Sequence, residues 1–196
     1  VRFIWIYTEN AEIAITDILF VEQDILPEED RGSEEETDKD GNIDVLESAS
    51  RDDTVYVNEK FGFSITASKN WQKEDDPDVL VLLREINTSS AFWVMASQVS
   101  ETSDLAQFVQ ETEKTLGYEV LSERNVVIDS VVGIEKVYRF AGDSILMRLK
   151  MVYLKKGQIV YALVGGTWEP LFPDMEADFD SIISSFAFID SVTYDT

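Results

Sequence analysis

The stretch SILMRLKMVYLKKGQIVYALVGG, residues 144–166, decides the fold of this chain. It holds two runs, 144–156 and 158–166, that are rich in β-branched, aliphatic and aromatic residues and are joined by a short Lys-Gly turn. Such residues favour strands, and a connection this short joins strands that run antiparallel. The stretch therefore predicts a β-hairpin within an antiparallel sheet.

Further strand-like runs lie on the N-terminal side of this hairpin. Residues 69–78, KNWQKEDDPD, interrupt them because they are polar, and we expect a loop there with Trp71 as its one apolar anchor. Short connections join most of the runs, which again favours antiparallel pairing. The runs that we expect to be strands are 61–66, 79–86, 91–100, 118–128 and 131–141.

Two segments change to the helical period. In residues 103–117 the apolar side chains fall on one helical face, with Ser103 as the expected N-cap and Gly117 as the stop. In residues 172–186 apolar residues recur at three- and four-residue steps after a start at Pro173. This order of elements predicts an α+β fold in which helices cover an antiparallel β-sheet.

The N-terminal part of the chain is predicted to lie outside this α+β domain, which we assign to residues 54–196. Residues 1–21 contain two strand-like runs, 2–8 and 11–21, and predict a β-ribbon or appendage. Residues 22–53 carry 14 acidic and three basic residues without periodicity, which is typical of a solvated linker. A two-stranded ribbon is marginal alone, so we expect it to join the main sheet, to belong to an upstream domain, or to pair with a second copy.

A ribbon that pairs with its copy would make the chain a homodimer through residues 2–21. No run of about 18 apolar residues is present, so we expect no direct membrane insertion by this sequence. The chain begins at Val1 rather than Met, and a removed N-terminal signal or anchor segment is one explanation.

Composition excludes several classes of function. Sixteen basic and 39 acidic residues give a net charge of -23, which repels nucleic acid and anionic lipid. The sequence has no cysteine and no histidine, which excludes disulfides, thiol nucleophiles, histidine general bases and the usual zinc and copper ligands. Carboxylate chemistry and oxygen-ligated hard ions remain.

Two motifs carry a family resemblance. YVNEKFGFSITASKNWQ, residues 56–72, places an aromatic residue and Asn before GFSI and a Trp shortly after it. QIVYALVGGT, residues 158–167, leads through an aromatic-rich loop to a helix that ends in Ser185-Phe186. Over roughly residues 55–190 the chain resembles the PsbP-like domain family, which includes the PsbP and DcrB types. A proline that is common before the Trp is absent here, and residues 1–54 have no counterpart in the resemblance.

The resemblance implies an αβα sandwich around an antiparallel sheet. It also implies a non-enzymatic accessory protein, because many members of the family are exported lipoproteins or lumenal factors. A shared fold does not transfer a function, and no binding residue carries over on the motifs that match.

One acidic stretch nearly has the spacing of a calcium loop. In EEETDKDGNIDVLE, residues 34–47, acidic side chains alternate, Gly41 stands at the sixth position of the loop and an acid stands at the twelfth. The alternative is a charged turn in a solvated linker, since the first position holds the longer Glu and the upstream flank is a poor helix. The candidate calcium ligands are Glu36, Asp38, Asp40, Asn42 and Glu47.

Tryptophans and further carboxylates give the remaining candidate sites. Trp71 and Trp168 fall in predicted loops and are candidates for a partner surface, whereas Trp93 falls inside a strand pattern and is expected in the core. The acids of residues 75–78 and 174–180 could serve a hydrolase, but a solvated face explains them as well.

These observations lead to one main hypothesis and two alternatives. The main one is a non-catalytic accessory domain of an exported or membrane-anchored protein, which acts outside the cytoplasm in assembly with a protein partner and needs no cofactor. The first alternative is a calcium-binding surface module that uses residues 36–47. The second is a hydrolase that works with carboxylates alone.

Overall fold

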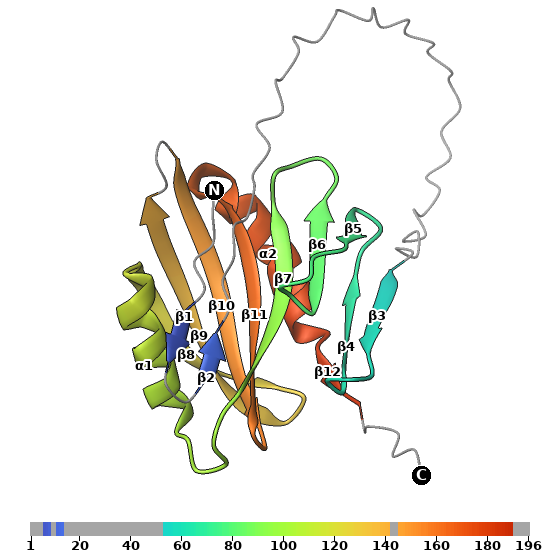
Figure 1. The fold of residues 1–196 in the computed structure, drawn as a ribbon. Coiled ribbons are helices and arrows are strands. Elements are labelled where there is room, and N and C mark those ends of the chain that lie inside the picture. The colour runs from blue at the N-terminus through green and yellow to red at the C-terminus, as the bar shows by residue number, and fades with distance from the viewer. Residues whose placement is uncertain (1–5, 9–10, 14–52, 142–144, 190–196) are drawn as a thin grey trace, which may run out of the picture.

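The computed structural model describes residues 6–8, 11–13, 53–141 and 145–189 (Figure 1). A seven-stranded sheet forms its middle layer, in the order β5-β6-β7-β11-β10-β9-β8. All neighbouring strands in it are antiparallel, as the sequence predicts. The strands are β5 (Trp71–Glu74), β6 (Val81–Glu85), β7 (Ala91–Gln98), β8 (Glu119–Ile128), β9 (Val131–Ala141), β10 (Leu146–Lys156) and β11 (Ile159–Trp168).

The hairpin of β10 and β11 lies at the centre of this sheet. The two strands pair from Met147 opposite Trp168 to Lys156 opposite Ile159. Gly157 turns the chain between them with a φ of 61°, a left-handed conformation that glycine adopts without strain. The hairpin predicted from residues 144–166 is therefore confirmed, and both of its strands are almost wholly buried.

The helix α1 (Leu105–Leu116) covers one face of the sheet. Its N-cap is Asp104, whose Oδ1 accepts hydrogen bonds from the backbone amides of Ala106 at 2.7 Å and Gln107 at 3.1 Å. The prediction of Ser103 as the cap is therefore wrong by one residue, because the carboxylate of Asp104 reaches the free amides of the first turn. Gly117 ends the helix with a φ of 64°, as predicted.

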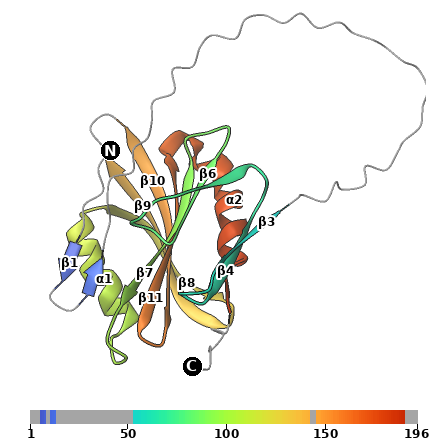
Figure 2. The same cartoon turned by 45° about the vertical axis from the view of Figure 1, so that its right-hand side comes forward.

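The helix α2 (Phe172–Ser184) covers the opposite face, after a short 3-10 turn η1 (Glu169–Leu171). Figure 2 shows α1 and α2 on opposite sides of the sheet. A three-stranded sheet of β3 (Thr54–Asn58), β4 (Phe63–Ala67) and β12 (Ala187–Phe188) packs on the same side as α2. The predicted α+β fold with helices on both faces is confirmed.

Residues 69–78 do not form the predicted loop throughout. β5 pairs with β6, with Trp71 opposite Glu85, and it forms one edge of the main sheet. Only Trp71 of its four residues is buried, so the segment lacks the alternation that marks a strand. Hydrogen bonding to β6 and the packing of one aromatic ring decide the structure here, and neither is visible in the local sequence.

Two adjacent glycines let the layers approach closely. A Cβ added at Gly165 would lie 2.5 Å from ring atoms of Phe179, which is completely buried in α2. On the other face, a Cβ at Gly166 would lie 2.8 Å from Leu149 and 3.1 Å from Trp93. The absence of side chains at Gly165 and Gly166 thus lets aromatic rings pack closely on both faces of β11.

A buried lysine of the sheet anchors each helix. Lys150, with a side chain 2% exposed, binds Glu176 at 3.2 Å and also Asp180, both on α2. On the other face Lys136 binds Glu113 of α1 at 2.6 Å. A buried ammonium needs paired carboxylates, so these contacts fix each helix over one position of the sheet.

The predicted N-terminal ribbon is present where the structure describes it. β1 (Ile6–Thr8) and β2 (Ala11–Ile13) pair antiparallel, and they form a separate two-stranded sheet rather than joining the main one. The ribbon lies on the side of the sheet that carries α1 (Figures 1 and 2). No helix in the described ranges is long and apolar enough to cross a membrane.

Candidate functional site

The end of the sheet where β9, β10 and β11 meet the start of α2 combines arginines, an indole and exposed apolar side chains. We call it the Trp168 corner. β9 supplies Arg139, β10 and the residue before it supply Ile145, Leu146 and Arg148, and the end of β11 leads into Trp168 and Glu169. Its residues are Arg139, Ile145, Leu146, Arg148, Trp168 and Glu169.

Two arginines of the corner lie directly opposite each other. Arg139 of β9 pairs with Arg148 of β10 in the register of the sheet. Like charges at such positions repel each other, so the pair needs a counter-ion. Glu169 provides it, because its Oε1 accepts hydrogen bonds from Nη2 of Arg139 at 2.6 Å and from Nη2 of Arg148 at 2.5 Å.

These contacts shift the acid–base properties of the corner. Hydrogen bonds from Arg139 and then from Arg148 hold the pKa of Glu169 below its usual value. The hydrogen bond to Glu169 likewise raises the pKa of Arg139, which also contacts Glu119 at 3.3 Å. The carboxylate therefore loses its charge at a lower pH than a free glutamate does.

Two polar donors of the corner have no hydrogen-bond partner within the described part of the chain. They are the indole Nε1 of Trp168 and Nε of Arg148, and both atoms are shielded from solvent. The guanidinium of Arg148 lies 5.2 Å from the ring centre of Phe172, a cation–π contact with the start of α2. The indole of Trp168 is half-buried.

Exposed apolar side chains stand at and just before the start of β10, the strand that carries Arg148. Leu146 is 49% exposed and Ile145 is 36% exposed, although they belong to the most strongly apolar stretch of the chain. Tryptophan and arginine beside exposed aliphatic side chains are the composition that is enriched where proteins bind one another. The corner can therefore supply apolar area to another protein.

The structure places the two predicted surface tryptophans differently. Trp168 is the last residue of β11 and not part of a loop as predicted, and it keeps part of its side chain at the surface. Trp71 is only 2% exposed and its ring lies 6.0 Å from that of Phe179. It is therefore a core residue, and we withdraw it as a partner-surface candidate. Trp93 is 4% exposed, which confirms its predicted place in the core.

The hollow beside Trp71 is small. It measures about 130 Å³ and lies between the end of β4 and α2, lined by hydroxyl groups and Asp178. Pockets for small-molecule ligands usually occupy about 300–1,000 Å³. Ser185 lines this hollow and accepts a hydrogen bond from the Thr66 amide at 2.8 Å. The hollow is therefore part of the contact between β4 and the end of α2.

The carboxylates do not form an acid–base pair where the structure describes them. Two carboxylates are buried, Glu85 on β6 and Glu135 on β9. Four strand spacings separate those strands, which is roughly 19 Å and far beyond the 5–9.5 Å of a hydrolytic pair. Each also has its own donor, Asn87 for Glu85 and Arg124 for Glu135. On α2, Glu176 and Asp180 bind Lys150 instead.

The candidate calcium loop lies outside the described residues, so the ligands Glu36, Asp38, Asp40, Asn42 and Glu47 stay a prediction. Within the described ranges, no cluster of three or more acids is arranged to hold a metal ion.

Comparison with known proteins identifies the family. Residues 13–188 match the family model of the PsbP-like proteins. The chain belongs to the PsbP-like family. The match begins upstream of residue 55, where the resemblance in the sequence starts, and it includes the last residue of β2. No curated protein matches the chain.

Solved structures share the PsbP-like fold. The solution structure of cyanobacterial PsbP from Synechocystis sp. PCC 6803 has a TM-score of 0.57 and 16% identity, over 74% of this chain and 97% of that one. LpqN of Mycobacterium tuberculosis, described as involved in cell envelope biogenesis, has a TM-score of 0.54 and 8% identity, over 74% and 88%. A structure from Bacteroides thetaiotaomicron gives 0.53 and 11%, over 69% and 48%. At these identities the likeness shows the fold alone.

Sequence reasoning missed the arginine pair and Glu169. Arg139 and Arg148 are nine residues apart in two strands, and only the register of the sheet places them opposite each other. In the alternating pattern of a strand, a charged residue on an otherwise buried face is unusual. This is the one sequence signal that could have identified the two arginines.

Proposed function

We propose that this PsbP-like chain is a non-catalytic accessory domain that binds another protein through the Trp168 corner. The observation that carries this proposal is that one end of β9, β10 and β11 bears the exposed Ile145 and Leu146, the neutralised arginine pair and, on the opposite face of the sheet, Trp168. A partner with an apolar segment fits this surface, because it would cover the exposed aliphatic side chains.

The arrangement of the carboxylates and phenols in the described residues supports the same proposal. The buried carboxylates of the described residues lie on distant strands and have their own donors, and the sequence holds no cysteine or histidine. Burial raises the pKa of Tyr138 and Tyr153 above that of free tyrosine, so these two phenols stay protonated and do not act as bases. A hydrolase that works with carboxylates alone is correspondingly disfavoured.

We further propose that the domain acts outside the cytoplasm. Family membership supports this, as does the fold shared with LpqN, which is described as involved in cell envelope biogenesis. The net charge of -23 would keep such a domain away from anionic lipid headgroups while it binds protein.

A photo-crosslinking amino acid at Leu146 tests the binding surface in cells of the source organism. We expect a discrete covalent adduct with one protein, and we expect Trp168→Ala to reduce it. The matched control is the same probe at Val55, which is 59% exposed on β3 and distant from the corner. Equal adducts at both positions, or none at Leu146, would refute the corner as the binding surface.

Once the partner is known, affinity gives a quantitative test. A half-buried tryptophan at the centre of an interface typically contributes about 2 kcal/mol or more, so Trp168→Ala should weaken binding by roughly 30-fold. The double variant Val55→Asp/Val57→Asp should bind as the wild type does, because both side chains project into solvent from β3.

A further inference from the structure

The sheet face that carries α1 is wider than the helix. α1 lies over β9 and β10, where Glu113 binds Lys136 and Tyr138 of β9. A helix with its side chains is about 10–12 Å across, which is the width of roughly two strands. From β6 to β9 this face extends over five strands, or roughly 19 Å between the outer strand axes.

The part of the face beyond β10, the strand that α1 contacts most, is also buried and apolar. It lies on β6, β7 and β11, in a core separate from the one beneath α2. None of its side chains is more than 9% exposed, so side chains from outside these three strands cover them. The side chains are Leu82, Ala91, Trp93, Val160, Ala162 and Val164.

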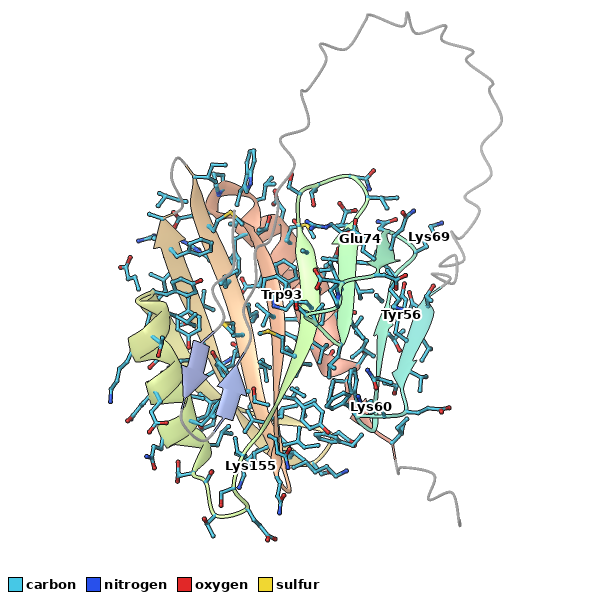
Figure 3. All side chains as sticks on the ribbon, in the orientation of Figure 1. Tyr56, Lys60, Lys69, Glu74, Trp93 and Lys155 are labelled. Carbon is cyan, nitrogen blue, oxygen red and sulfur yellow. The ribbon has the colours of Figure 1, made fainter. Side chains whose placement is uncertain are left out.

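The N-terminal ribbon occupies the place where this cover is needed. β2 runs close to β7, the strand that carries Trp93 (Figure 3). The ribbon is drawn on the α1 side of the sheet in both views (Figures 1 and 2). Residues 2–8 and 11–21 are rich in apolar side chains, which suits contact with an apolar face.

The linker between the ribbon and β3 favours docking within one chain. The predicted linker of residues 22–53 has about 32 residues, which corresponds to an r.m.s. span of roughly 30 Å if it is flexible. That span is comparable with the width of the domain, so the tether keeps the ribbon at an effective concentration on the order of millimolar near the sheet. A second copy must reach millimolar concentration to compete.

We propose that the apolar face of β6, β7 and β11 is a docking site for an apolar β-ribbon, and that residues 1–21 of the same chain fill it. The ribbon is then an intramolecular ligand on an acidic tether, and it completes the fold instead of serving as a dimerisation arm. This inference is independent of the Trp168 corner. The family match, which begins at residue 13 and not at the start of β3, agrees with it.

A spin label on the ribbon of the full chain tests the proposal. The chain has no cysteine, so Glu12→Cys gives a single site for a nitroxide. We expect strong loss of amide signal intensity in β7 and β11, and little loss in β3 at the far side of the molecule. A label at Glu59→Cys, on the exposed turn before β4, is the control and should affect β3 and β4 instead.

Mixing distinguishes the occupants. When nitroxide-labelled chain without nitrogen-15 is mixed with unlabelled nitrogen-15 chain, the β7 signals should keep their intensity. Their loss in the mixture would show that a second copy supplies the ribbon, which overturns docking within one chain. No loss in either sample would show that the ribbon does not dock on this face at all.

A charged variant adds a second readout. Ile6 and Ile13 pair across the ribbon, so the variant Ile6→Asp/Ile13→Asp should release the ribbon from the sheet. In a chain that carries the spin label at position 12, the amide signals of β7 should then regain their intensity. The binding of a dye that fluoresces on apolar surfaces should increase. Val55→Asp/Val57→Asp adds the same charge at exposed positions and should change neither readout. Unchanged β7 broadening in the Ile6→Asp/Ile13→Asp variant would contradict the proposal.

Discussion

Replacing Gly165 with alanine tests how closely α2 packs on the centre of the sheet. The added Cβ would lie 2.5 Å from Cγ and Cδ1 of Phe179 and 2.9 Å from its Cδ2. Carbon atoms in contact prefer about 3.5–4.0 Å, so the ring must retreat by roughly 1 Å. Phe179 has little room to do so, because it is completely buried between Trp71 and Phe172.

The expected cost of this substitution combines two terms. Overpacking of a well-packed core costs about 1–3 kcal/mol. Replacing a strand glycine with alanine returns about 0.5–1 kcal/mol through the smaller entropy of the unfolded chain. We therefore expect Gly165→Ala to lower the free energy of unfolding by about 1–2 kcal/mol, and to lower the melting temperature by roughly 2–8 °C.

Urea unfolding followed by circular dichroism measures this change, and Phe179→Leu shows where it arises. A smaller side chain makes room for the new methyl group, so the double variant should be more stable than the sum of the single effects allows. The expected coupling free energy is about 0.5–3 kcal/mol. Wild-type stability of Gly165→Ala, or strict additivity with Phe179→Leu, would refute the argument that the glycine is required by contact with α2.

Three further predictions concern charges. Arg124→Met should lower the free energy of unfolding by about 1–3 kcal/mol, because it leaves the buried carboxylate of Glu135 on β9 unpaired. Lys150→Met should change the free energy of unfolding by less, because the two acids left on α2 are about half exposed. Chemical unfolding measures both changes. Glu169 has a lowered pKa in the folded protein, so its contribution is present above its unfolded pKa of about 4.3 and is lost as pH falls through the folded value. Thermal melts between pH 7 and 2 should therefore fall less steeply for Glu169→Gln below about pH 4, and parallel curves would contradict this. Calorimetry with calcium tests the alternative function: a calcium loop at residues 36–47 predicts heat for the wild type and none for Asp38→Ala/Asp40→Ala, whereas a charged turn predicts equal, negligible heats.

The helices and most strands could be predicted because their signals are local. Nearby residues in the sequence are enough to recognise the apolar stripe of the helix at 103–117. The same holds for the alternating or continuous apolar runs of β6, β7 and β8 to β11. The N-cap differed by one residue because Ser103 and Asp104 both suit that position. β5 and β12 escaped prediction because each is short and is held by pairing with a strand rather than by its own pattern.

The candidate site was only partly predictable. Trp168 was found because a tryptophan next to a turn is conspicuous. Arg139, Arg148 and Glu169 come into contact only when the strands are placed in register and the chain turns into α2. Trp71 was misplaced because burial against Phe179 depends on a helix that begins about a hundred residues later.

The amino-acid sequence by itself determined the α+β class, the two amphipathic helices and the chemistry that is absent from this protein, because composition and short-range periodicity do not depend on distant residues. The tertiary structure decided which face each helix covers, the opposition of the two arginines beside Glu169, the closeness of Gly165 to Phe179 and the place of the ribbon beside β7. Those features follow from strand register and layer packing, in which residues far apart in the sequence must fit together, and so no local pattern could specify them.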